Sequence, residues 1–251
     1  MSKSSQQVQF PGASGEALAA RLDLPDGEPV AFALFAHCFT CSKDTRASAY
    51  ISGALADAGM AVLRFDFTGL GGSEGEFANT NFSSNIDDLV AAADFLREKY
   101  QAPSLLVGHS LGGAAVLVAA PRIEESVAVA TINAPVDPSH VLHLLKDSLE
   151  TIQRRGQAEV ELAGRRFRIT RQFIEDVSER KLTDVLGKLR RALVVFHAPR
   201  DTTVSIDNAS SIFTAAKHPK SFVSLDDADH LLTRRQDALY VGSVLAAWAT
   251  R

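Results

Sequence analysis

Ser110 stands at the centre of residues 108–112, Gly-His-Ser-Leu-Gly, which form a Gly-x-Ser-x-Gly pattern. Residues 104–107 before it, Ser-Leu-Leu-Val, predict a short buried strand, and residues 111–120 predict a helix that a proline stops. A strand that turns abruptly into a helix holds its turn residue in a strained conformation and exposes the side chain above the sheet. The turn also leaves the Leu111 amide at a helix N-terminus, where it can stabilise an anion. The pattern therefore predicts a nucleophilic serine.

Asp201 and His230 are the predicted partners of this serine. A serine hydroxyl is a poor nucleophile at neutral pH and needs a base in contact, itself oriented by a carboxylate. Asp201 follows a predicted strand at 192–197, and His230 follows one at 221–225. Both therefore fall at strand carboxyl ends, where a parallel sheet places its site. Asp137 also follows a predicted strand and is the alternative acid.

A second backbone donor is expected on the loop after the apolar strand at 30–36. Stabilising a tetrahedral anion requires an amide opposite the one that follows the nucleophile. We assign this role to the Phe39 N–H, with Cys38 as the near alternative. His37 is expected to brace the loop rather than to take part in catalysis.

Cys38 and Cys41 on this loop form a Cys-x-x-Cys pattern. A structural zinc site needs a second ligand pair, and the sequence has only these 2 cysteines, so no metal is predicted. One interpretation is two buried, inert thiols. The other is a redox pair, whose oxidation would fix the loop and lower activity reversibly.

The composition excludes several classes of protein. The chain has 251 residues, a net charge of -4 and 22% charged residues, so nothing indicates nucleic-acid binding. No apolar run approaches the ~18 residues that predict a membrane span. The N-terminal residues do not form an export signal, so we expect a cytoplasmic protein without a disulfide framework. The glycine-rich loop at 69–72 lacks the third glycine of a dinucleotide site, so no cofactor is predicted.

Short apolar segments alternate with amphipathic ones along most of the chain. Predicted strands cover residues 8–10, 17–24, 30–36, 61–65, 104–107, 127–132, 192–197 and 221–225, and predicted helices cover 48–58, 82–100, 111–120, 206–216 and 235–249. Continuous apolar runs are typical of parallel strands buried on both faces. The alternation predicts a single α/β domain over residues 1–251, with a mainly parallel sheet between two helical layers.

Residues 133–190 interrupt this alternation and predict a small inserted lid. Ser139 is expected to cap a helix that ends at Gly156. Residues 159–169 alternate between polar and apolar, which is typical of a β-hairpin with one buried face.

The predicted hairpin has a two-residue loop at Gly164-Arg165. This register would pair Leu162 with Phe167 and Val160 with Ile169 on the apolar face, and Glu161 with Arg168 on the other. We expect the apolar face to lie over Ser110. The residues predicted to line a compact substrate pocket are Cys38, Leu142, Leu145, Leu149, Phe167 and Phe173.

Taken together, these motifs resemble an α/β-hydrolase over nearly the whole chain. Four segments resemble in sequence the hydrolase half of bifunctional α/β-hydrolase/OsmC proteins: residues 37–44, 64–71, 79–84 and 228–232. In those proteins an esterase-like serine hydrolase precedes a peroxide-reducing OsmC-type domain. A weaker similarity links the chain to cinnamoyl and feruloyl esterases, which have a comparable lid. The resemblance implies an OsmC-type domain or protein as a candidate partner, and a homodimer is a second candidate assembly.

The residues and the resemblance both predict a serine esterase. Ser110, His230 and Asp201 would cleave small to medium carboxylic esters through an acyl-enzyme, with the Phe39 and Leu111 amides as oxyanion donors. Alternatives on the same triad are a thioesterase, an aminopeptidase, an acyltransferase or a perhydrolase. A ligand sensor that keeps the fold without catalysis is a further alternative. Dehalogenase and epoxide-hydrolase chemistry is excluded, because those enzymes have Asp where Ser110 stands.

Overall fold

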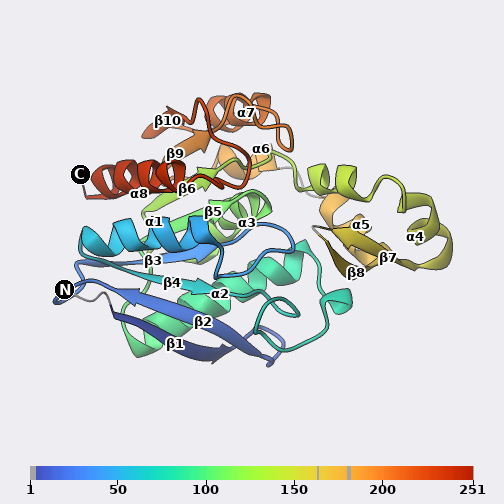
Figure 1. Cartoon of the computed structure of the whole chain (residues 1–251), viewed down its shortest axis with the longest axis horizontal. Helices are drawn as coiled ribbons and strands as arrows, with labels where there is room; N and C mark the ends of the chain where they lie inside the picture. The colour runs from blue at the N-terminus through green and yellow to red at the C-terminus, as the bar shows by residue number, and fades with distance from the viewer. Residues whose placement is uncertain (1–3, 163, 180–181, 251) are drawn as a thin grey trace.

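The computed structural model describes residues 4–162, 164–179 and 182–250, which are organised around an eight-stranded sheet (Figure 1). In sheet order the strands are β1 (Ser4–Pro11), β2 (Ala17–Leu24), β4 (Met60–Phe65), β3 (Ala31–Ala36), β5 (Leu105–His109), β6 (Ala128–Ile132), β9 (Ala192–His197) and β10 (Lys220–Ser224). The β1–β2 and β2–β4 pairs are antiparallel, and every other neighbouring pair in this sheet is parallel. The predicted, mainly parallel sheet is confirmed.

Helices cover both faces of this sheet. α1 (Arg46–Asp57) and α8 (Arg235–Ala249) lie on one face, and α2 (Phe82–Lys99), α3 (Leu111–Ala119) and α7 (Asp207–Ala215) lie on the other. Strand β5 shows why both layers are needed: Leu106 joins the core under α2 and α3, whereas Leu105 and Val107 join the core under α1 and α8. All three are buried, as expected for a central parallel strand. No helix in the described part of the chain is long and apolar enough to span a bilayer.

The segment between β6 and β9 lies for the most part beyond the carboxyl ends of the central strands (Figure 1), whereas its last helix packs against α3 and α7. Its elements are a 3₁₀ helix (Pro138–Leu145), α4 (Leu149–Arg155), the antiparallel pair β7 (Gln157–Leu162) and β8 (Arg165–Thr170), α5 (Arg171–Glu179) and α6 (Leu182–Leu186). Shorter 3₁₀ turns at Phe77–Asn79 and Ala120–Arg122 occur elsewhere. We use the name lid for the described residues between positions 133 and 190.

The single helix predicted to begin at Ser139 is instead two elements. Asp137 caps the first, because its carboxylate accepts a hydrogen bond from the Ser139 backbone N–H at 2.9 Å. The Ser139 prediction was therefore wrong, and the cap lies two residues earlier. The second element ends, as predicted, at Gly156, whose φ of +83° is the left-handed conformation that favours glycine at a helix end.

The lid hairpin has the predicted faces but not the predicted register. Val160 pairs with Phe167, and Leu162 pairs with Arg165, so Arg165 belongs to β8 and the turn lies one position earlier. Gly164 has a φ of +74°, and Ala163 lies outside the described residues. The two registers differ by two residues along one strand, so both leave the same side chains on the buried face. Hydrophobic alternation therefore could not distinguish them.

Candidate active site

Ser110 lies on a sharp turn between β5 and α3. Its φ of +55° is unfavourable for a residue with a Cβ atom, so the surrounding backbone must hold the turn in place. A Cβ on Gly108 would come within 2.3 Å of the Gly112 carbonyl oxygen. The strand and the helix thus meet closely enough to require glycine. The predicted strand–turn–helix context of the serine is present.

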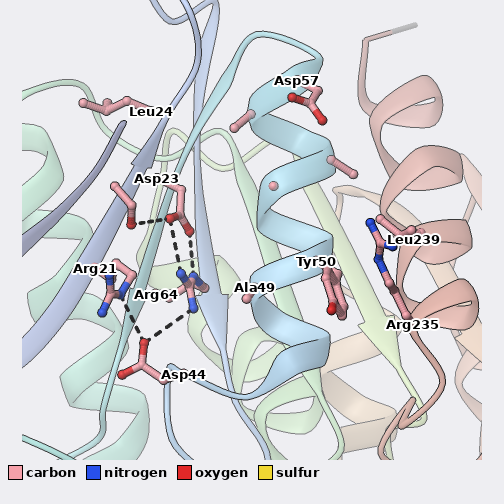
Figure 2. Close-up of a pocket in the computed structure, with 14 residues that line it drawn as sticks. Arg21, Asp23, Leu24, Asp44, Ala49, Tyr50, Asp57, Arg64, Arg235 and Leu239 are labelled. Atoms are coloured by element: carbon pink, nitrogen blue, oxygen red, sulfur yellow. Dashed lines mark hydrogen bonds and ion pairs between the residues drawn. The ribbon is translucent and has the colours of Figure 1, made fainter. Parts of the chain in front are cut away.

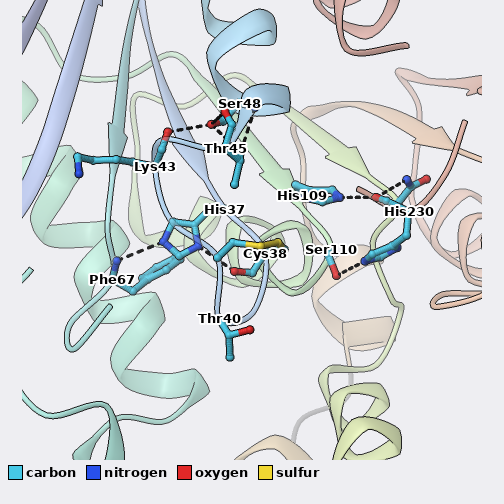
Figure 3. Close-up of a disulfide and its surroundings, with 12 residues drawn as sticks. His37, Cys38, Thr40, Lys43, Thr45, Ser48, Phe67, His109, Ser110 and His230 are labelled. Carbon is cyan, nitrogen blue, oxygen red and sulfur yellow. Dashed lines mark hydrogen bonds between the residues drawn. A yellow bond between two sulfur atoms is a disulfide. The ribbon is translucent and has the colours of Figure 1, made fainter. Parts of the chain in front are cut away.

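Ser110, His230 and Asp201 lie in hydrogen-bond contact although they are far apart in sequence. His230 Nε2 is 2.9 Å from Ser110 Oγ, and His230 Nδ1 is 2.7 Å from Asp201 Oδ2 (Figure 3 shows the first contact). A carboxylate only accepts, so Nδ1 carries the proton and Nε2 can accept one from the serine hydroxyl. The alternative acid, Asp137, instead caps the 3₁₀ helix of the lid.

The Asp201 carboxylate is buried and held in its charged form. Burial raises its pKa, but hydrogen bonds from His230 and from the Val204 and Thr203 backbone N–H groups outweigh burial, so the pKa lies below its usual range. A charged Asp201 can orient His230 and stabilise it when it becomes positive.

His109 and Asn133 fix the backbone of His230, a role that sequence reasoning missed. His109 Nε2 donates to the His230 carbonyl oxygen at 2.7 Å (Figure 3), and Asn133 Nδ2 donates to the same oxygen at 2.9 Å. The Asn133 side-chain oxygen accepts from the Ala198 N–H at 2.9 Å, so this buried residue joins the ends of β6 and β9 to the His230 loop. Asn133 follows a strand carboxyl end, the same signal that identified Asp201.

The loop after β3 packs directly against this turn. A Cβ on Gly112 would come within 2.4 Å of the His37 carbonyl oxygen, so the two backbones are in contact. Phe39 and Leu111 both line the cavity that contains Ser110. Among the described residues, neither the Phe39 N–H nor the Leu111 N–H has a hydrogen-bond partner in the protein. Neither amide is therefore taken up by a hydrogen bond within the described part of the protein.

His37 fixes the peptide group that carries the Phe39 N–H. Its Nδ1 lies 2.8 Å from the Cys38 carbonyl oxygen (Figure 3), and because a carbonyl only accepts, Nδ1 carries the proton. In a planar trans peptide the Cys38 C=O and the Phe39 N–H point in opposite directions, so holding one directs the other. Burial lowers the pKa of His37 and keeps the ring neutral. This contact supports the expected bracing role.

Comparisons with known proteins also identify a hydrolase. Residues 29–156 match the family described as serine aminopeptidase, S33. The chain belongs to this family of α/β-hydrolases. The esterase domain of a Rhodothermus marinus protein is 52% identical over 98% of both chains, with a TM-score of 0.80. Est1E from Butyrivibrio proteoclasticus, solved with ferulic acid bound, is 18% identical over 97% of this chain and 100% of its own, with a TM-score of 0.78.

Mouse α/β hydrolase domain-containing protein 10 is 18% identical over 98% of both chains, with a TM-score of 0.79. Likenesses at this level of identity concern the fold alone. A search of curated proteins found no significant match.

The cavity of the hydrolase at Ser110 has a volume of about 210 Å³. Besides Ser110 it is lined by Phe39, Leu111, Pro135, His140, Val141, His143, Leu144, Thr202, Thr203 and Val204. Four of these lining residues belong to the 3₁₀ helix of the lid. Because a 3₁₀ helix repeats every three residues, residue 143 lies above residue 140, and residue 144 lies above residue 141. His140 and His143 line this cavity, His143 with an exposed side chain, and His140 Nε2 also lies 2.6 Å from the Thr203 carbonyl oxygen.

The side chains predicted to line the pocket lie elsewhere. Leu145, Phe167 and Phe173 are buried in the hydrophobic core that the lid shares with α2, α3 and one face of the sheet, Leu142 and Leu149 pack against that core, and Cys38 lines neighbouring cavities. Rings nevertheless join the lid to the Phe39 loop. Phe39 stacks on Phe173 with ring centroids 5.4 Å apart, and Phe77 lies 5.9 Å from Phe39 and 5.0 Å from Phe167.

Cys38 and Cys41 of the hydrolase form a disulfide, with Cα atoms 5.3 Å apart. The interpretation as two inert thiols is therefore wrong. A short disulfide fits here because the Cys41 N–H also bonds to the Cys38 carbonyl at 3.1 Å, which closes a tight turn. In the described part of the chain, no group of three or more His, Cys, Asp or Glu side chains could hold a metal ion.

A cavity of about 480 Å³ lies away from Ser110, between α1, α8 and the edge of the sheet (Figure 2). Figure 2 shows ion pairs on its wall: Arg64 binds Asp23 at 2.7 Å, Arg21 binds Asp44 at 3.1 Å, and Arg64 also lies 3.9 Å from Asp44. These charges neutralise each other, the Ser5 hydroxyl on the wall donates to Asp23, and no histidine that could activate a hydroxyl lies among the described residues that line the cavity. The smaller cavity at Ser110 is therefore the candidate active site.

Proposed function

We propose that this chain is a serine carboxylesterase that cleaves small to medium carboxylic esters through an acyl-enzyme. The observation that supports this most strongly is the contact of Ser110 Oγ with His230 Nε2 at 2.9 Å, with Asp201 on the other ring nitrogen. The 52% identity to a domain described as an esterase favours ester substrates. The cavity of about 210 Å³ favours compact ones.

In the proposed reaction His230 takes the Ser110 proton while the serine oxygen attacks the ester carbonyl. The tetrahedral anion receives hydrogen bonds from the Leu111 and Phe39 amides, and each donor is worth ~10²–10³ in turnover. His230 then gives the proton to the leaving alcohol. Water attacks the acyl-enzyme by the same route and releases the acid.

The family description also raises an aminopeptidase as an alternative. An aminopeptidase must recognise a free ammonium group, which requires a carboxylate or several acceptors near the nucleophile. No Asp or Glu occurs among the described residues that line the Ser110 cavity. This lining favours an ester over a peptide N-terminus.

The test is a chain-length series of p-nitrophenyl esters with wild type and Ser110→Ala. We expect activity to peak at short to medium acyl groups and to fall by ~10⁶ in the variant. Labelling of wild type by a fluorophosphonate probe, absent in Ser110→Ala, separates an enzyme from a ligand sensor. No labelling, or activity that rises steadily to long acyl groups, would contradict the proposal. A panel of thioesters and aminoacyl arylamides tests the other reactions.

A further inference from the structure

The Cys38–Cys41 disulfide encloses the residue whose amide we propose as an oxyanion donor. Phe39 and Thr40 are the only residues between the two cysteines, so the bond closes a small ring that contains the Phe39 N–H. Figure 3 shows the disulfide between His37 on one side and the Ser110–His230 pair on the other. The bond therefore adds a covalent constraint to the segment that carries the Phe39 amide.

Non-covalent contacts hold this loop at its ends and in its middle, where Phe39 stacks on Phe173. At the start of the loop, His37 contacts the Cys38 carbonyl. At its end, the Asp66 carboxylate accepts hydrogen bonds from the backbone N–H of Lys43 at 2.6 Å and from the Lys43 ammonium group at 2.7 Å. Between these anchors, the Thr40 carbonyl accepts from Arg165 of the lid at 3.3 Å. Thr40 also has a φ of +60°, a conformation that a β-branched residue keeps only when its surroundings impose it. The disulfide is the covalent constraint on that conformation.

A second cavity gives access to the disulfide from outside the ester site. It has a volume of about 260 Å³ and is lined by both cysteines, by Arg46 and His109, and by residues next to His230. Cys38 is buried, whereas Cys41 is only partly buried. An attacking thiolate would therefore meet Cys41 first, and the Arg46 guanidinium at the cavity wall favours an anionic nucleophile.

We propose that this disulfide is a thiol–disulfide exchange site for a dithiol reductant, and that its reduction slows catalysis by releasing the Phe39 loop. A thiolate of the dithiol attacks Cys41 Sγ, the bond to Cys38 breaks, and Cys38 leaves as a thiolate that takes up a proton. The second thiol of the reductant then displaces Cys41. In total two electrons and two protons pass to the cysteine pair, and the reductant leaves as a disulfide.

The oxidised protein is thus the active form, because it is the form in which the triad and the free amides occur together. This reverses the sequence-based expectation that oxidation lowers activity. The effect on turnover rests on the proposed esterase function, whereas the exchange itself does not.

The experiment counts thiols and measures turnover on the same native samples. The protein is incubated with dithiothreitol or with thioredoxin kept reduced by its reductase, then alkylated with iodoacetamide and analysed by mass spectrometry. We expect no alkylation before reduction and alkylation of both cysteines after it. The kcat for a p-nitrophenyl ester should fall by roughly ten- to a hundred-fold with little change in KM, below the ~10²–10³ expected for complete loss of one donor. Removal of the dithiol and reoxidation should restore it.

Two variants serve as controls. Cys38→Ser/Cys41→Ser cannot form the bond, so its kcat should match that of reduced wild type and should not respond to dithiol. Ser110→Ala should show the same thiol counts as wild type, which separates failure of this inference from failure of the esterase proposal. Far-UV circular dichroism verifies that the reduced protein stays folded.

Reduction by either reagent supports the exchange site, and the reagent that works distinguishes a small dithiol from a dithiol protein. The inference is overturned if neither releases thiols from the native protein. It is equally overturned if both cysteines are released while kcat stays the same, or if kcat falls only together with loss of the folded state.

Discussion

His109 offers a test of the site through stability rather than activity. Its buried ring donates from Nε2 to the His230 carbonyl, a bond that neutral imidazole can make. Burial, and secondly the nearby His230, lower the pKa of His109 to about 4. The unfolded chain has the ordinary value of about 6.5, so it takes up a proton at a higher pH than the folded protein does. His109→Gln keeps an amide donor and removes this titration.

The magnitude follows from the two pKa values. Between about pH 6.5 and about pH 4 the unfolded state binds more protons at this residue, so the free energy of unfolding falls as the pH falls. A gap of roughly 2.5 pKa units at about 1.4 kcal/mol each gives a total loss of roughly 3.5 kcal/mol well below pH 4. At about pH 5 the loss is about 2 kcal/mol, and above the unfolded pKa it vanishes.

Urea unfolding of wild type and His109→Gln at about pH 7.5 and about pH 5 measures this loss. Other acidic and basic groups titrate equally in both proteins, so only the difference between the two pH dependences matters. We expect wild type to lose about 2 kcal/mol more than the variant on going to the lower pH. Equal losses in the two proteins would refute the assignment of His109 as a buried, neutral support of the His230 loop.

Three further predictions concern activity and packing. Asp201→Asn should lower kcat by ~10⁴, because the amide favours the wrong His230 tautomer, and steady-state kinetics measure it. His37→Phe keeps a ring but removes the donor to the Cys38 carbonyl, so kcat should fall by roughly tenfold or more at nearly constant KM; a rise in KM alone would contradict the positioning role. Gly112→Ala places a methyl group against the His37 carbonyl and should destabilise the protein by about 1–3 kcal/mol or more in urea unfolding, whereas Gly187→Ala, with its nearest neighbour at 3.7 Å, should leave stability within about 0.5 kcal/mol.

The fold could be predicted from the sequence because its signals are local. The apolar run of β3 and the strand–turn–helix pattern around Ser110 each lie within a few consecutive residues. Asp201 and His230 were predicted beside Ser110 because strand ends of a parallel sheet converge at one edge, and the structure places them there.

The remaining features depend on contacts that leave no local pattern. The bond from His109 to the His230 backbone links residues 121 positions apart, and neither residue type indicates it. In the lid, Val141 and Leu144 face the cavity because their segment has the period of a 3₁₀ helix, whereas the prediction was one helix from Ser139 to Gly156 with Leu142, Leu145 and Leu149 in the pocket. Both helical forms bury apolar residues on one side, so composition could not decide between them.

The stack of Phe39 on Phe173 has a consequence for redesign of this hydrolase. One ring belongs to the loop that would stabilise the reacting oxygen, and the other belongs to the part of the protein that an engineer would exchange to admit bulkier molecules. If the Phe39 amide acts as proposed, we expect exchange of that part to change how fast the bond is broken as well as which molecules fit. A library that varies it should retain an aromatic ring at position 173 or compensate at position 39.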